Sequence, residues 1–179
     1  MNQSWRKHFA PKKPTARQAV GARSQYIGES FESWCNTQHR EAVQQGILAW
    51  WRHVSPRVKW IGKGERAQAK IVGDAVADYV MQLCVSGRAV VAEAKATEKE
   101  RLVRSAIEPQ QFDHLEACVK HGGLGILLGQ FTIDGLPWRY AAPWPVPWRE
   151  RGQGASIGVE ELQEWQVKSG ENYLRRFIR

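Results

Sequence analysis

Cysteine is scarce in this sequence, and long apolar runs are absent. The three cysteines, Cys35, Cys84 and Cys118, are widely spaced and form no C-x-x-C pair. This pattern excludes a disulfide framework and a cysteine-based zinc site, and it indicates reduced packing residues of a cytoplasmic protein. No window holds the ~18–20 continuous apolar residues of a membrane span, and residues 1–14 lack the apolar centre of a secretory signal. We therefore expect no membrane segment.

Negative charge is also in short supply, most of all near the N-terminus. The chain carries 26 Lys and Arg against 18 Asp and Glu, for a formal net charge of +8. This excess favours a polyanionic partner, above all nucleic acid, over a merely basic enzyme. Residues 1–24 contain no acidic residue, and Pro11 and Pro14 interrupt any helix there. We interpret them as a basic, flexible arm that is either solvated or lies along DNA phosphates, with contacts from Lys12, Lys13 and Arg17.

The chain does have enough apolar material for one folded domain, which we assign to residues 25–179. A hydrophobic content of 42% and nine Trp argue against wholesale disorder. Apolar spacing and turn residues predict a helix over about 25–45, a strand over 47–54, a hairpin over 78–96, a helix from Pro109, strands over 124–131 and 137–142, and a short helix over 159–165. This order predicts an α/β fold with a mixed, mostly antiparallel sheet flanked by helices.

A second basic segment interrupts this order at residues 55–70. Pro and Gly alternate there with cations, which predicts a projecting loop or hairpin. Its candidate DNA contacts are Arg57, Lys59, Trp60, Lys63, Arg66 and Lys70. Trp60 either stacks on an unpaired base or packs in the core. A charged loop after residue 97 adds Lys99, Arg101 and Arg104.

The stretch VVAEAKAT, residues 90–97, places two opposite charges inside an apolar run. Residues two apart in a strand point to the same face, so Glu93 and Lys95 share one. Burying both is costly unless they pair or hold a metal. If Ser86-Gly87 is a two-residue turn, Asp78 lies opposite Lys95, and Val80 lies opposite Glu93. The three ionisable groups then cluster at the open end of the hairpin, and a register slip of one would separate them.

Such a cluster suits phosphodiester hydrolysis. Two close carboxylates repel each other unless a proton or a divalent cation intervenes, and Mg²⁺ prefers oxygen ligands. A nearby lysine can orient a water molecule or stabilise the transition state. The alternative is a structural ion pair at a sheet edge.

The first predicted helix offers a further candidate acid. Glu32, Asn36 and His39 form a polar stripe at four- and seven-residue steps, which is either part of a site or a solvated helix face. The histidines show no H-x-x-x-H spacing, so we expect no histidine metal site.

Four short segments together resemble a known family. GESFE on a helix, DY opening a strand, EAKAT closing the next strand and QQFDHL starting a helix resemble the RecU-type Holliday junction resolvases. These enzymes fall within the restriction-endonuclease-like PD-(D/E)xK nucleases. The similarity runs from about Gly28 to Glu164. It implies an endonuclease that is a homodimer, uses Mg²⁺ with Mn²⁺ as a substitute, and cuts branched DNA in a bacterial cell or a phage-infected host.

The resemblance also implies roles for individual residues. Glu32 matches an acidic residue of the first helix, Asp78 and Glu93 match the metal-binding carboxylates, and Lys95 matches the lysine that stabilises the transition state. Gln111 matches a glutamine at the metal site, and residues 55–70 match a stalk that enters the junction.

Two features depart from the family pattern. Val76 replaces a threonine near the metal. The spacing between aspartate and glutamate is also longer than expected, so Asp74 rivals Asp78 as the ligand. The remaining alternatives are a related nuclease that acts on flaps, ends or duplex DNA, and a non-catalytic DNA-binding protein.

Overall fold

The fold is taken from a computed structural model, which describes residues 15–54, 58–61, 68–71, 77–148 and 155–178. Several residues singled out in the sequence lie outside these ranges: Lys12, Lys13, Arg57, Lys63, Arg66, Asp74 and Val76. Within the described residues, no helix has both the length and the apolarity needed to cross a membrane.

The first helix, α1, runs over Ala16–Gln44 and begins earlier than predicted. Thr15 caps it: the Thr15 hydroxyl accepts from Gln18 N, and the Gln18 side chain accepts from Thr15 N. This capping box starts a helix directly after Pro14. Residues 16–24, predicted as part of a flexible arm, are therefore helical. Their apolar periodicity is weak because all of them are exposed.

Five strands form the main sheet, in the order β1-β4-β5-β7-β8. Within it only β5 and β7 pair in parallel, and α2 supplies the crossover that a parallel pair needs. The other neighbouring pairs are antiparallel, so the predicted mixed, mostly antiparallel sheet is confirmed. The bounds are β1 Leu48–His53, β4 Tyr79–Leu83, β5 Ala89–Thr97, α2 Pro109–Lys120, β7 Leu124–Ile133 and β8 Leu136–Pro143.

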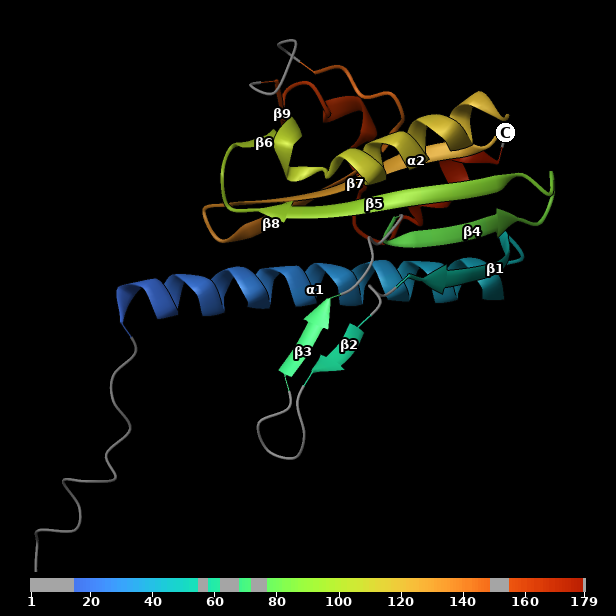
Figure 1. Ribbon diagram of the computed structural model, residues 1–179. Helices are drawn as coiled ribbons and strands as arrows, with labels where there is room; N and C mark the ends of the chain where they lie inside the picture. Colours follow the sequence, from blue (N-terminus) through green and yellow to red (C-terminus); the bar gives the residue numbers. More distant parts are fainter. Residues whose placement is uncertain (1–14, 55–57, 62–67, 72–76, 149–154, 179) are drawn as a thin grey trace, which may run out of the picture.

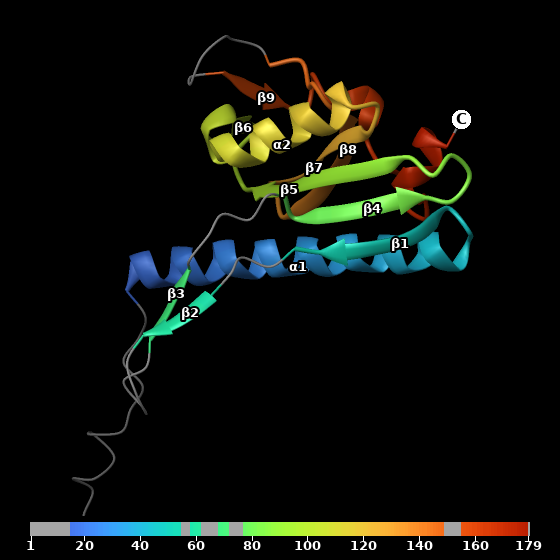
Figure 2. The ribbon, with the colours of Figure 1, turned by 45° about the vertical axis from the view of Figure 1, so that its right-hand side comes forward.

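The two long helices cover opposite faces of this sheet (Figures 1 and 2). On the α1 face, Phe31 and Cys35 pack against Tyr79, Ile126 and Leu128. A second buried cluster lies on the α2 face and includes Val91, Leu115, Leu127 and Trp144. A hydrophobic core therefore covers each face of the sheet. A polar or charged side chain buried in either core needs a hydrogen-bond or charge partner there. All three cysteines are free; Cys35 is buried as expected, whereas Cys84 is exposed.

The β4–β5 hairpin forms, but its register differs from the predicted one. Val80 pairs with Val91 rather than with Glu93. The turn comprises residues 84–87, and Leu83 N donates to Arg88 O at 3.0 Å. Arg88 also donates to the carbonyls of Gly122 and Gly123, each at 2.8 Å, so the α2–β7 connection holds the end of the turn. The shift is two residues, which keeps every side chain on its predicted face.

The basic segment after β1 contains an antiparallel hairpin, β2 Val58–Ile61 and β3 Gln68–Ile71. Lys59 pairs with Lys70 and Trp60 with Ala69 in its register. This hairpin forms a two-stranded sheet of its own.

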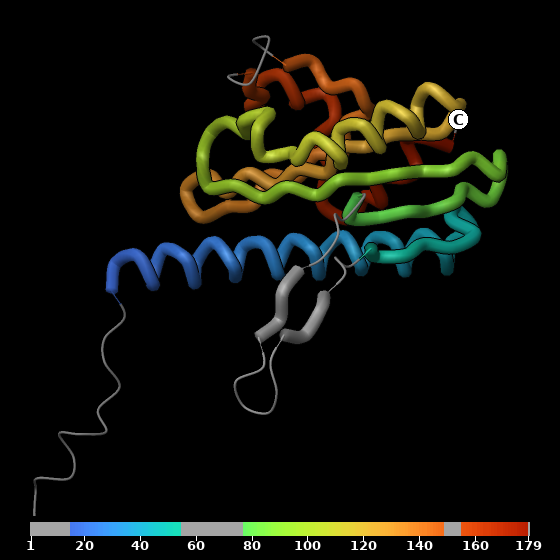
Figure 3. Tube along the Cα trace, in the orientation of Figure 1, coloured from blue at the N-terminus to red at the C-terminus, as the bar shows by residue number. Residues whose placement is uncertain are grey.

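The last part of the chain wraps back over the sheet. Strand β9, Ser156–Gly158, pairs with β6, Arg101–Val103, which leads into the 3₁₀ helix η3, Arg104–Ala106. The predicted helix over 159–165 shrinks to η4, Gln163–Trp165, because the Glu161 carboxylate accepts from Gly158 N at 2.9 Å and holds a turn. The chain ends after the 3₁₀ helix η5, Tyr173–Phe177, at the end of the sheet that carries the β4–β5 turn (Figure 3).

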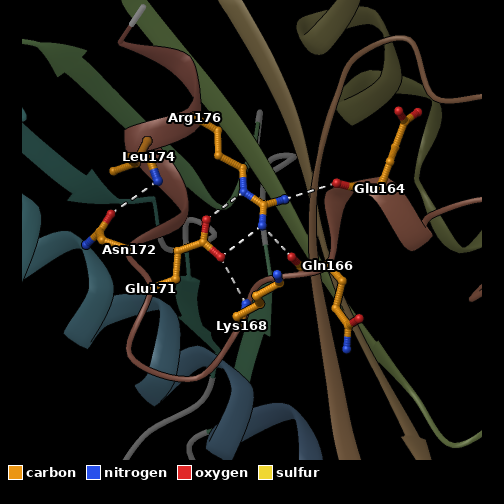
Figure 4. Close-up of polar contacts among 7 residues, drawn as sticks. All are labelled: Glu164, Gln166, Lys168, Glu171, Asn172, Leu174 and Arg176. Atoms are coloured by element: carbon orange, nitrogen blue, oxygen red, sulfur yellow. Dashed lines mark hydrogen bonds and ion pairs between the residues drawn. The ribbon is translucent and has the colours of Figure 1, made fainter.

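Arg176 ties this terminal segment together. Its guanidinium pairs with both Glu171 oxygens, at 2.8 and 2.9 Å, and donates to the carbonyls of Glu164 and Gln166 (Figure 4). Tyr173 is fully buried, and its hydroxyl lies 2.5 Å from His39 Nε2. His39 is therefore a core residue and not part of a solvated stripe, and burial lowers its pKa to about 3.

Candidate active site

Asp78 stands where the chain enters β4, at the end of the sheet opposite the β4–β5 turn. Its carbonyl accepts from Val54 N, and its Oδ2 accepts from Ala94 N, both at 2.8 Å. These two bonds tie Asp78 to the end of β1 and to the middle of β5. The carboxylate is thus held against the edge of β5, beside Glu93.

Glu93 and Lys95 project from β5 toward α2. The Glu93 side chain is 0% exposed, and Lys95 Nζ lies 2.6 Å from its Oε1. Burial, followed by the negative charge of Asp78, raises the pKa of Glu93 to about 7, and Lys95 opposes this rise. The predicted cluster of Asp78, Glu93 and Lys95 therefore forms, because the even register shift preserved the face.

Gln111 lies beside this cluster but faces Lys95. Its Oε1 accepts from Lys95 Nζ at 3.3 Å and from Glu108 N at 3.0 Å, the second bond being part of the α2 capping box. The amide oxygen that the resemblance assigned to a metal thus accepts from two donors. These bonds hold Lys95 and the start of α2, and a direct bond from Gln111 to a metal remains a prediction.

A pocket of about 200 Å³ opens on the α1 side of the same strand ends. It is lined by Gly28, Phe31, Glu32, His53, Asp78, Tyr79, Ala94 and Ala96. Glu32 comes from α1 and His53 from the last position of β1, and Glu32 Oε1 lies 3.4 Å from His53 Nδ1. Asp78 thus lies between this pocket and the Glu93–Lys95 pair. His53 was missed from the sequence, because only the β1–β4 pairing brings it beside Asp78.

The donor set fits a divalent cation. Glu93 Oε1 is paired with Lys95 Nζ at 2.6 Å, whereas the buried Oε2 has no hydrogen-bond donor among the described residues and is an oxygen that a second cation would satisfy. The two carboxylates supply oxygen ligands of the kind that Mg²⁺ and Mn²⁺ take. Among the described residues, no three His, Cys, Asp or Glu side chains are grouped for a metal, so Asp78 and Glu93 are the two carboxylates that could hold one here.

The candidate DNA contacts differ in their surroundings. Arg17 on α1 and Lys99 after β5 are exposed, as a phosphate contact must be. Arg104 lies over the Phe112 ring, with Cζ 4.2 Å from the centroid. Arg101 makes internal bonds: its guanidinium pairs with Glu161 at 2.8 Å and bonds Ser156, which ties β6 to β9. The others lie on β2 and β3 or outside the described residues.

Comparison with known proteins settles the family. The profile described as "Recombination protein U" (RecU) matches residues 36–170. The chain belongs to the RecU family. The matched range includes Asp78, Glu93, Lys95 and Gln111, whereas Glu32 lies before it. The resemblance seen in the sequence is thereby confirmed, and the chain is an endonuclease of the Holliday junction resolvase class.

The structural comparison finds an archaeal protein of similar fold. It is Hjc of Archaeoglobus fulgidus, described as a Holliday junction resolvase from a hyperthermophile. The two are 11% identical, the match covers 82% of this chain and 94% of that chain, and the TM-score is 0.49. No curated protein matches the sequence significantly.

Proposed function

We propose that this RecU-family chain resolves four-way DNA junctions through paired, symmetric nicks that depend on Mg²⁺, with Mn²⁺ as a substitute. The observation that carries the proposal is the constellation of Asp78, Glu93 and Lys95 at one end of β4 and β5. Glu93 is fully buried beside Asp78, and Lys95 lies 2.6 Å from it. Burying these charges costs folding free energy, and such arrangements are typical of catalytic sites.

Each residue has a defined part in this mechanism. Asp78 and Glu93 hold the cation through their carboxylate oxygens. Bound Mg²⁺ supplies a more acidic water and neutralises charge on the reacting phosphate. Lys95, held by Gln111 at 3.3 Å, faces the same phosphate and stabilises its growing negative charge.

The substrate explains the assembly we propose. A four-way junction has two-fold symmetry, so a symmetric homodimer places one site on each of two opposing strands. Recognition relies on DNA shape and phosphate positions rather than base edges. Residues 55–70 enter the junction centre as a stalk, and Arg17, Lys99 and Arg104 contact phosphates on the arms. We place the reaction in the cytoplasm of a bacterium or a phage-infected host, where recombining DNA lies.

The decisive experiment compares variants and substrates. Asp78→Asn and Glu93→Gln are expected to abolish cleavage of a four-way junction in Mg²⁺ while leaving junction binding near that of the unaltered protein. Asp113→Asn and Glu116→Gln make the same chemical changes at exposed positions of α2, and they are expected to cut normally. Cleavage that persists in both site variants would refute the metal site.

The two alternatives are separated in the same assay. Faster cutting of flapped, linear or plain duplex DNA than of the four-way junction would identify a related nuclease with another substrate. Absence of any cleavage in Mg²⁺ or Mn²⁺, with binding intact, would identify a non-catalytic DNA-binding protein.

A further inference from the structure

The pocket on the α1 side of Asp78 contains a pair of residues that the proposed mechanism leaves without a task. Glu32 and His53 come from different elements and meet at its wall, with Nδ1 of His53 3.4 Å from Glu32 Oε1. His53 also lies against the Tyr79 ring, with centroids 5.2 Å apart. The imidazole is therefore held on one edge by a carboxylate and on one face by an aromatic ring.

The other edge of the imidazole is unused. Because Nδ1 faces Glu32, Nε2 lies on the opposite side of the ring, and no described residue bonds to it. The pocket has space for a guest, since Ala94 and Ala96 form part of its lining and the position of a Cβ on Gly28 has no heavy atom within 4 Å. Both partners reach solvent, with 33% of the His53 side chain and 46% of the Glu32 side chain exposed.

We propose that His53, in the form that carries a proton on both ring nitrogens and with Nδ1–H directed at Glu32, is a substrate-contacting residue whose Nε2–H donates a hydrogen bond to the DNA phosphodiester that is cut next to Asp78. This inference rests on the proposed function and deepens it. It gives Glu32 a positioning role through His53 in place of direct contact with the reacting atoms. An N–H donor aimed at a phosphate oxygen fits a pocket in which Asp78 and Glu32 would otherwise repel the anion.

The chemistry of histidine substitutes allows a sharp test. The amide of Gln can place an N–H near the Nε2 position, whereas the shorter Asn reaches only the Nδ1 position. His53→Gln is expected to keep kcat within roughly 10-fold, while His53→Asn and His53→Ala are expected to lose roughly 10²-fold, the usual effect of removing one donor to a reacting anion. Glu32→Gln is expected to fall between them, because it weakens the orientation and not the contact.

A second measurement does not depend on cleavage. Junction affinity in Ca²⁺ is compared for DNA with a normal linkage and with an uncharged methylphosphonate at the cut site. The modification is expected to weaken binding by the unaltered protein and to change binding by His53→Ala much less, because the lost contact is the same one. His121→Asn alters an exposed histidine at the far end of α2 and serves as the control.

The outcomes separate this inference from the proposed function. If Asp78→Asn abolishes cutting while His53→Asn, His53→Gln and the unaltered protein cut equally, the contact is refuted and the metal site stands. If Asn rescues better than Gln, the pair with Glu32 is structural and the contact is again refuted. If the methylphosphonate weakens junction binding by His53→Ala as much as it weakens binding by the unaltered protein, the proposed contact is also refuted. Thermal unfolding of each variant shows whether a loss comes from the fold, and the Gln–Asn comparison still decides if His53→Ala does not fold.

Discussion

Glu93→Gln is expected to stabilise the metal-free protein at alkaline pH while it destroys the nuclease. The pKa of Glu93 is raised from 4.5 to about 7, chiefly because the side chain is buried and secondly because Asp78 is negative. A raised acid pKa means that the folded state holds the proton more tightly than the unfolded state. Ionised Glu93 therefore works against folding, and glutamine, a neutral side chain of the same shape, does not.

The magnitude follows from linkage between protonation and folding. The cost of ionising Glu93 is absent well below pH 4.5, grows as the pH rises from 4.5 to 7, and is complete above that range. A rise of this size corresponds to about 3 kcal/mol at pH 8 and to less than about 1 kcal/mol at pH 5. We expect Glu93→Gln to exceed the unaltered protein in free energy of unfolding by these amounts.

The assay is urea unfolding in a chelator at several pH values. Glu171→Gln is the control with the opposite sign, because hydrogen bonding to Arg176 lowers the pKa of Glu171. That variant should be less stable than the unaltered protein above pH 4.5, by about 1 kcal/mol, and the deficit should fade as the pH falls through the lowered pKa. A Glu93→Gln protein whose stability advantage is absent at pH 8, or is the same at pH 5 and 8, would refute the assigned burial and charge of Glu93.

Two further predictions concern the site's support and the N-terminus. Gln111→Leu removes the acceptor for Lys95 Nζ and for Glu108 N. We therefore expect the cleavage rate to fall by roughly 10-fold and the free energy of unfolding to fall by about 1 kcal/mol. Gln110→Leu, at the neighbouring position, is the control and should change cleavage little, so equal rates for the two variants would contradict the role of Gln111. Removing residues 1–14 leaves the Thr15 cap in place. In a plot of log binding constant against log salt concentration, the slope for junction binding is expected to become shallower by about 0.9 for each of Lys12 and Lys13 that contacts a phosphate. An unchanged slope would show that neither lysine does.

Much of the site could be predicted because it depends on strand periodicity. Glu93 and Lys95 share a face whatever their partners are, since side chains alternate along β5. The predicted closeness of Asp78 to Glu93 held for the same reason, although the turn was predicted wrongly. The observed register differs from the predicted one by two residues, which keeps the side chains on the same face. Gln111 was placed correctly next to the cluster, but its two hydrogen bonds could not be foreseen without the position of α2.

Other features could not be foreseen because they depend on partners that are distant in the sequence. In the sequence Arg101 is one more cation of a basic loop. In the structure it donates to the carboxylate of Glu161, sixty residues further along the chain. His39 reads as part of a polar stripe, yet Tyr173 and Tyr79 enclose it in the core. His53 carries no local signal at all. Only the pairing of β1 with β4 and the packing of α1 across the sheet bring it to Glu32.

The sequence by itself determined the order of the main elements, the face on which the charges lie and the family, because these depend on local spacing and on short runs of residues. The tertiary structure decided the register of the hairpin, the internal use of Arg101 and the second wall of the pocket. These features depend on which residues, distant in the sequence, pair with a buried charge or accept from an unpaired donor. Those partners meet only when the helices pack on the sheet.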